Sequence, residues 1–198
     1  TPINHDFSHD KSHGYYTLAK IMKRLIPLIL TVLCVAGCRS NAQERHLGSL
    51  AELPIFTQFA RGFELLELLE GLPHQAFEKE ALKKEINEKD AMKLNGYWFY
   101  EELLEIQAKD EEELRSILSD NSSYAPYSGI KRCGGFHPDY GVKLLNKSEA
   151  VYFYICFGCG EIKAYRGKKE LHADLSNVSS KRLKELLKPY GQNRPNIN

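Results

Sequence analysis

Three cysteines in the C-terminal half of the chain have the clearest chemical potential. Cys156 and Cys159 are spaced as C-x₂-C, and Cys133 is followed four residues later by His137. Thiolates and imidazole nitrogens are the usual ligands of tetrahedral zinc, so these four residues could form a Cys₃His site. A zinc ribbon uses two C-x₂-C pairs, whereas this sequence contains one. Zinc is therefore one of several interpretations, and the expected cofactor is either none or zinc.

A structural disulfide is the second interpretation of these cysteines. In an oxidising compartment Cys133 could pair with Cys156 or with Cys159, leaving the third thiol free.

Thiol redox catalysis is the third interpretation, and the sequence disfavours it. A redox C-x₂-C motif opens a helix, whose N-terminus lowers the thiol pKa, but the residues after Cys159 alternate in polarity as in a strand. Inert buried thiols are a fourth interpretation, and the compartment decides between disulfide and zinc.

The N-terminal region carries the information about compartment. Met22 is followed by two basic residues and then by the uncharged run LIPLILTVLCVAG at 25–37. Thirteen residues are too few for a membrane span, which needs about 20. A positive segment, a short apolar run and small residues are typical of a secretory signal peptide. The stretch Val35-Ala36-Gly37-Cys38 resembles the lipobox of bacterial lipoproteins.

This resemblance implies that Cys38 is acylated and becomes the first residue of the mature chain, so membrane lipid is an expected partner. Arg39 replaces the aspartate that tends to retain such proteins in the inner membrane. The resemblance thus implies an exported protein anchored in the outer membrane and facing the periplasm, if the cell is Gram-negative. We expect residues 1–21 to be a non-native upstream extension, 22–37 a signal peptide, 38–54 a tether and 55–198 a single domain.

Charge and motifs exclude several function classes. The formal net charge of the 198 residues is +1, which disfavours nucleic-acid binding by bulk charge. Residues 38–130 carry a net charge of −8 and residues 131–198 a net charge of +7. We expect these halves to pack together and neutralise each other. The sequence contains no P-loop, dinucleotide-binding motif, nucleophile elbow or zinc-protease motif.

The elements that must position the cysteines are predicted to form an α+β fold. Aromatic and β-branched residues predict strands over 140–145, 150–157, 161–165 and 171–175, and a helix capped by Ser179 or Ser180 follows. Helices are also predicted over 74–90 and after Asp110 as N-cap. Residues 55–72 favour a helix weakly, although a strand over 63–70 is compatible with them. We therefore expect a small antiparallel β-meander with helices packed on one face.

A second set of candidate residues follows the turn predicted at Asn95-Gly96. It consists of four consecutive aromatic residues: Tyr97, Trp98, Phe99 and Tyr100. Such residues can stack on sugars or bases, although aromatic residues beside a turn more often belong to a core.

The sequence as a whole predicts a lipid-anchored envelope protein that binds an unknown protein or glycan, or that serves a structural role. In this interpretation the cysteines stabilise the fold by a covalent cross-link. The alternative is a zinc- or thiol-dependent enzyme centred on Cys133, His137, Cys156 and Cys159.

Overall fold

The computed structural model describes residues 50–195. The predicted upstream extension, the signal peptide, Cys38 and most of the tether lie outside the described residues. The helices are α2 (Leu53–Arg61), α3 (Lys79–Glu88), α4 (Ala108–Ser119) and α5 (Asn177–Leu187), with short 3₁₀ turns η1 (Asn121–Ser123) and η2 (Lys188–Tyr190). The strands are β1 (Leu65–Gly71), β2 (Ala91–Leu94), β3 (Tyr97–Leu104), β4 (Tyr124–Pro126), β5 (Tyr140–Asn146), β6 (Glu149–Cys156), β7 (Glu161–Arg166) and β8 (Lys169–Leu175).

All eight strands form one antiparallel sheet in the order β2-β3-β1-β5-β6-β7-β8-β4. The predicted meander is present as β5 to β8, and the α+β class is confirmed. The sheet is larger than predicted because β1 pairs with β5 and extends the meander toward β3 and β2, while β4 pairs with β8 at the other edge.

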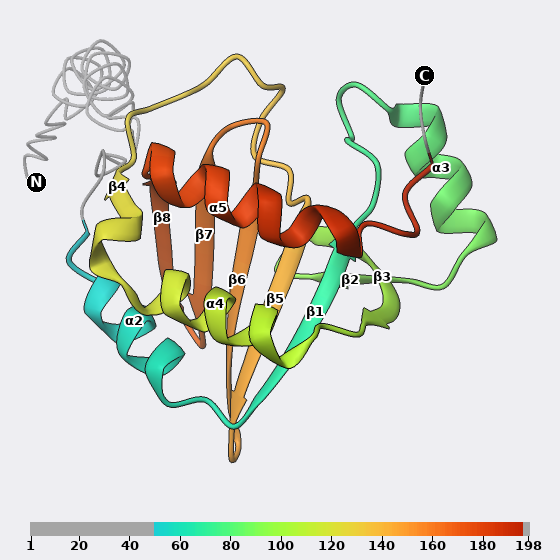
Figure 1. Cartoon of the computed structure of the whole chain (residues 1–198). Coiled ribbons are helices and arrows are strands. Elements are labelled where there is room, and N and C mark those ends of the chain that lie inside the picture. The colour runs from blue at the N-terminus through green and yellow to red at the C-terminus, as the bar shows by residue number, and fades with distance from the viewer. Residues whose placement is uncertain (1–49, 196–198) are drawn as a thin grey trace, which may run out of the picture. The chain divides into compact units, whose positions relative to one another are not determined.

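Helices α2, α4 and α5 lie on one face of the sheet, as Figure 1 shows. The alternating residues of β6 explain this arrangement: Val151, Phe153 and Ile155 are fully buried in the main core beneath these helices. The other set, Tyr152, Tyr154 and Cys156, points to the opposite face because successive side chains of a strand alternate. The prediction of helices packed on one face holds for these three helices.

The β2–β3 hairpin and α3 form a smaller unit at one edge of the sheet. Asn95 and Gly96 both have positive φ, 47° and 90°, which is the conformation of the tight hairpin turn that this dipeptide predicts. Tyr100 packs in a separate buried cluster with Leu72 and Leu82, and Leu82 belongs to α3. The hairpin thereby brings the aromatic run close to the end of β1.

Several predicted boundaries are wrong. The helix favoured over 55–72 is present only up to Arg61, and residues 65–71 form the strand that the sequence left open: Leu and Glu favour helix locally, but pairing with β3 and β5 overrides that preference. Asp110 lies in the first turn of α4 instead of capping it, and its carboxylate accepts a hydrogen bond from the Tyr190 hydroxyl at 2.6 Å. The N-cap of α5 is Ser176, whose Oγ accepts a hydrogen bond from Ser179 N–H.

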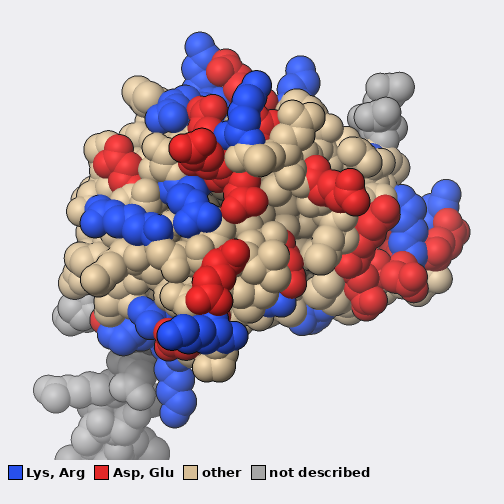
Figure 2. Space-filling view, turned by 60° about the horizontal axis from the view of Figure 1, so that its bottom comes forward, with Lys and Arg blue, Asp and Glu red and all other residues tan. Residues whose placement is uncertain are grey.

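Residues 50–130 from the acidic half of the sequence pack against residues 131–195 from the basic half. Ion pairs join them between Lys143 and Glu67 at 2.6 Å, and between Lys169 and Glu52 at 2.8 Å. On the face in Figure 2, basic and acidic side chains lie next to one another over much of the surface. The charge asymmetry of the sequence is therefore balanced by folding. Within residues 50–195, no helix combines the length and the apolar composition needed to cross a membrane.

Candidate functional site

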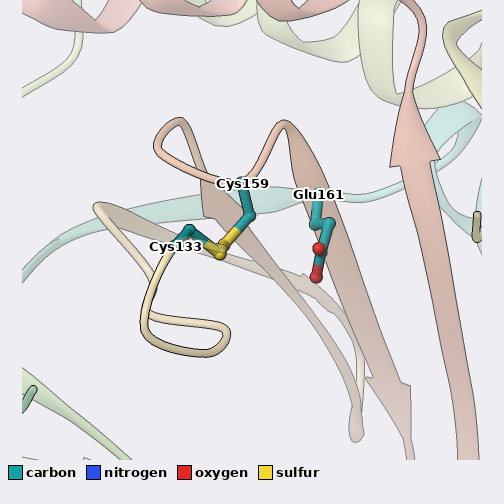
Figure 3. Close-up of side chains that lie close together, drawn as sticks. All are labelled: Cys133, Cys159 and Glu161. Atoms are coloured by element: carbon teal, nitrogen blue, oxygen red, sulfur yellow. A yellow bond between two sulfur atoms is a disulfide. The ribbon is translucent and has the colours of Figure 1, made fainter. Parts of the chain in front are cut away.

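The cysteine site contains one disulfide and one free thiol. Cys133 and Cys159 are bonded to each other, with Cα atoms 5.7 Å apart (Figure 3), and Cys156 is a buried free cysteine. This arrangement agrees with the disulfide interpretation and selects one of the two pairings that the sequence left open. While Cys133 and Cys159 share this bond, neither sulfur can serve as a thiolate ligand of zinc.

The free thiol of Cys156 is poorly suited to nucleophilic chemistry. Its side chain lies at the end of β6, and backbone N–H groups of His137 and Cys159 point at its sulfur, the latter from 3.4 Å. Burial nevertheless raises the pKa of the Cys156 thiol above its usual value. A thiol with a raised pKa is mostly protonated at neutral pH and reacts slowly. Its environment is that of a structural cysteine.

The disulfide fastens the loop between β4 and β5 onto the face of the sheet that lacks α2, α4 and α5. The ring of Tyr127 stacks on His172 with centroids 3.9 Å apart, and Phe136 meets Tyr97 edge-on at 5.3 Å. The Lys163 ammonium lies 5.2 Å from the centre of the Phe136 ring. The loop thus covers part of the sheet with aromatic side chains.

A cavity of about 400 Å³ lies between this loop, the hairpin turn and the segment that follows β1. Its wall includes Tyr97 and Trp98 from the hairpin, Phe136 and His137 from the stapled loop, and His74. The disulfide therefore restrains one wall of the cavity.

The aromatic candidates separate into two pairs. Tyr97 and Trp98 are half-buried and line this cavity, whereas Phe99 and Tyr100 are fully buried. The proposal of Phe99 and Tyr100 as binding residues is corrected: both rings are buried in small cores, which lie in separate clusters. The Tyr100 hydroxyl donates a hydrogen bond to the buried Glu85 carboxylate at 2.7 Å.

His137 belongs to the walls of two cavities. The second has a volume of about 240 Å³ and is also lined by Cys133, Cys156 and His74. The Nε2 of His137 lies 2.6 Å from the Leu72 carbonyl oxygen, and its ring lies 4.6 Å from that of His74. Burial, aided by the charge of Arg194, lowers the pKa of His137 below its usual value.

His74 is the one described residue with a buried side-chain polar atom that has no hydrogen-bond partner, its Nε2. Its Nδ1 accepts a hydrogen bond from Ala76 N–H at 3.0 Å. A ring nitrogen that accepts leaves the proton on the other nitrogen, so the unpartnered Nε2 is a donor. Buried donors are nearly always satisfied in folded proteins, and both cavities border this ring.

The predicted Cys₃His zinc set does not assemble. Within residues 50–195, the group whose ligating atoms all lie within 4.8 Å of one another consists of Cys133, Cys159 and Glu161. His137 and Cys156 are outside this group. His137 is oriented by the Leu72 carbonyl instead, and sequence spacing carries no information about that contact.

The contacts among the acidic and basic residues around the cysteines were not predictable from the sequence. Arg194 binds Asp139 at 3.0 Å, and Glu161 is buried beside the disulfide and hydrogen-bonded to His172 at 2.9 Å. The position of Glu161 directly after the C-x₂-C-G motif was the one available signal.

No family model, curated protein or solved structure matches this chain. The functional interpretation therefore depends on the chemistry of the described residues and on the N-terminal motif.

Proposed function

We propose that this protein is a lipid-anchored binding module of the bacterial cell envelope that holds a glycan in the 400 Å³ cavity. The observation that carries the proposal is the convergence of Tyr97, Trp98 and Phe136 with His74 and His137 around that cavity. The volume lies within the range of about 300–1,000 Å³ that is usual for small-ligand sites. Such sites combine apolar walls with a few polar groups that orient the ligand.

A sugar ring fits the chemistry of this wall. Its C–H faces can pack on aromatic rings, and its hydroxyl groups can accept or donate hydrogen bonds. The unpartnered Nε2 of His74 supplies a donor for a hydroxyl oxygen. The disulfide keeps Phe136 and His137 in place before the ligand arrives, which lowers the entropic cost of binding.

The alternative of a thiol- or zinc-dependent enzyme has less support. Cys133 and Cys159 are bonded to each other, and burial raises the pKa of the Cys156 thiol. No described cysteine is thus a ready nucleophile.

Binding can be measured through Trp98, the single tryptophan of the chain. The full chain in detergent is titrated with soluble peptidoglycan fragments and with oligomers of N-acetylglucosamine, and Trp98 fluorescence is recorded. We expect a saturable change. The variant Phe136→Ala should bind at least about five-fold more weakly, because an aromatic contact contributes about 1 kcal/mol beyond its buried area.

Tyr152→Phe is the matched control, because Tyr152 is an aromatic residue of β6 that does not line this cavity. Its affinity should equal that of the parent chain. If no glycan changes Trp98 fluorescence, or if Phe136→Ala binds as well as the parent, the cavity is not a glycan site.

The anchor has its own test. Cells that express the full chain are labelled with an alkyne-bearing fatty acid, and membrane fractions are collected. The lipobox predicts that the label is present on the parent chain, absent from Cys38→Ala and retained by Cys34→Ala, the other N-terminal cysteine. Label that persists in Cys38→Ala would show that Cys38 is not the acylated residue.

A further inference from the structure

A buried carboxylate lies beside the disulfide, although a disulfide does not need a carboxylate for its formation or stability. Glu161 is the first residue of β7, and its side chain is 3% exposed. Figure 3 shows its carboxylate next to the two sulfur atoms, and one oxygen lies within 4.8 Å of both. Burying a carboxylate is unfavourable unless charge or hydrogen bonds compensate for lost hydration.

The surroundings of Glu161 compensate for its charge only in part. His172 Nε2 lies 2.9 Å from one oxygen, and Lys131 Nζ lies 3.7 Å from the other. The same lysine binds Asp174 at 2.7 Å, and Asp174 is the cross-strand partner of Glu161. Two carboxylates thus share the positive charge of one lysine.

We propose that reduction of the Cys133–Cys159 disulfide converts this cross-link into a zinc site with Cys133, Cys159 and Glu161 as protein ligands. A dithiol reductant in the compartment of the protein supplies two electrons and two protons: the S–S bond breaks, two thiols form, and the dithiol becomes a disulfide. Zn²⁺ then displaces one proton from each thiol and bonds to both sulfurs and to a carboxylate oxygen.

The donor set and the spacing suit zinc. Thiolate sulfur and carboxylate oxygen are both established zinc donors, at about 2.3 Å and 2.0–2.2 Å respectively. Those bond lengths place the two sulfurs and the oxygen of a tetrahedral site about 3.5–3.8 Å apart. The three atoms already lie within 4.8 Å of one another, so shifts of about an ångström complete the geometry once the S–S bond is gone. Three protein ligands leave a fourth position open to water, as in catalytic zinc sites.

The outer contacts also fit a metal ligand. A ligating carboxylate is usually oriented by hydrogen bonds from neighbouring groups, and His172 occupies that position for Glu161. Lys131 donates to the carbonyl oxygen of Cys159 at 2.9 Å as well as to Asp174. It therefore ties the β6–β7 turn and β8 together on both sides of the site.

The test compares metal binding before and after reduction. The full chain carries Cys34→Ala and Cys38→Ala, so that the remaining thiols are those of the described region. It is reduced with a phosphine, freed of reductant without oxygen, and dialysed against Zn²⁺ or Co²⁺. We expect about one metal per chain after reduction and essentially none before it, with the Co²⁺ form showing the intense absorption of tetrahedral thiolate coordination.

Two variants test the ligand set. Glu161→Gln should weaken zinc binding at least about ten-fold, because a neutral amide replaces an anionic ligand. Cys156→Ala removes the adjacent thiol that the proposal does not use, and it should bind zinc like the parent. Circular dichroism checks that each variant folds.

Thiol alkylation of the parent chain provides a measurement that does not depend on those variants folding. Zinc should slow alkylation of Cys133 and Cys159 in the reduced chain and leave that of Cys156 unchanged. The proposal fails if the reduced, folded chain binds no metal, if zinc protects Cys156 instead of Cys133 and Cys159, or if folded Glu161→Gln binds zinc as tightly as the parent.

Discussion

At the scale of single residues, Glu70 makes contacts that the sequence did not indicate. It is a buried carboxylate in β1, and it accepts hydrogen bonds from the backbone N–H groups of Gln192, Asn193 and Arg194 at 2.7–3.1 Å. The Arg194 guanidinium then reaches the Asp139 carboxylate. One carboxylate thus holds the C-terminal segment against the strand that borders the candidate site.

The variant Glu70→Gln should lower the free energy of unfolding by about 2 kcal/mol, because hydrogen bonds to a charged group are stronger and the new NH₂ faces backbone donors. Urea denaturation followed by circular dichroism measures the change. The control is Glu102→Gln on the exposed part of β3, for which we expect less than about 0.5 kcal/mol. Equal stability of the two variants would contradict the role of Glu70 in holding the C-terminal segment.

His137 should make stability depend on pH. Because its pKa is lowered in the folded protein from the usual 6.5, the unfolded chain binds more protons as the pH falls below about 6.5. The free energy of unfolding should therefore be highest above that pH and decrease toward pH 5. Urea midpoints at pH 7.5 and 5.5 measure this slope, which should be smaller in His137→Gln. An unchanged slope would assign the dependence to other groups.

Among the elements, the loop between β4 and β5 depends most on a covalent constraint. It carries Phe136 and His137, and the Cys133–Cys159 disulfide joins it to the β6–β7 turn across a sequence separation of 26. Pro138 packs closely on the end of β1: its carbonyl oxygen lies 1.9 Å from where a Cβ of Gly71 would be. A glycine is therefore required there for the loop to approach the sheet.

Replacing both bonded cysteines by serine should lower the free energy of unfolding by about 2–4 kcal/mol, since the unfolded chain loses a cross-link. Urea denaturation monitored by Trp98 fluorescence reports both stability and the state of the cavity. Cys156→Ala is the matched control, and it should cost about 1 kcal/mol because only a small buried side chain is lost. A double variant as stable as the parent would mean that packing alone holds the loop.

At the scale of the whole molecule, the eight-stranded sheet joins the two halves of the chain. β1 comes from the acidic half, and it pairs with β5 from the basic half along six residue pairs. The main core spans helices and strands of both halves. Neither half therefore buries its apolar surface without the other.

Hydrogen exchange should reflect this organisation. Amides of β5, β6 and β7 should exchange most slowly, because each strand has two neighbours and a core beneath it. Amides of β2 and β4, which lie at the sheet edges, should exchange fastest among the strands. Mass spectrometry of exchanged peptides measures the order. Equal protection of β2 and β6 would contradict a stability gradient across the sheet.

Predictability from sequence differs between the two halves of the fold. The strands of the meander were predictable because they are rich in aromatic and β-branched residues such as Val151, Phe153 and Ile155. The residues of β1 were left between a helix and a strand over 63–70, because they favour helix locally and their strand form depends on partners that are distant in sequence. Helix starts were displaced because several polar residues near each start are acceptable caps.

By itself, the sequence determined the α+β class, the tight turn at Asn95-Gly96 and the chemical types at the site, because these follow from local pattern and side-chain identity. Only the tertiary structure decided which cysteine bonds to Cys133, that Phe99 is buried while Trp98 lines a cavity, and that Glu161 lies beside the disulfide. Those outcomes depend on strand order and on how a loop crosses the sheet. Long-range pairing sets both, and a linear spacing of residues does not encode it.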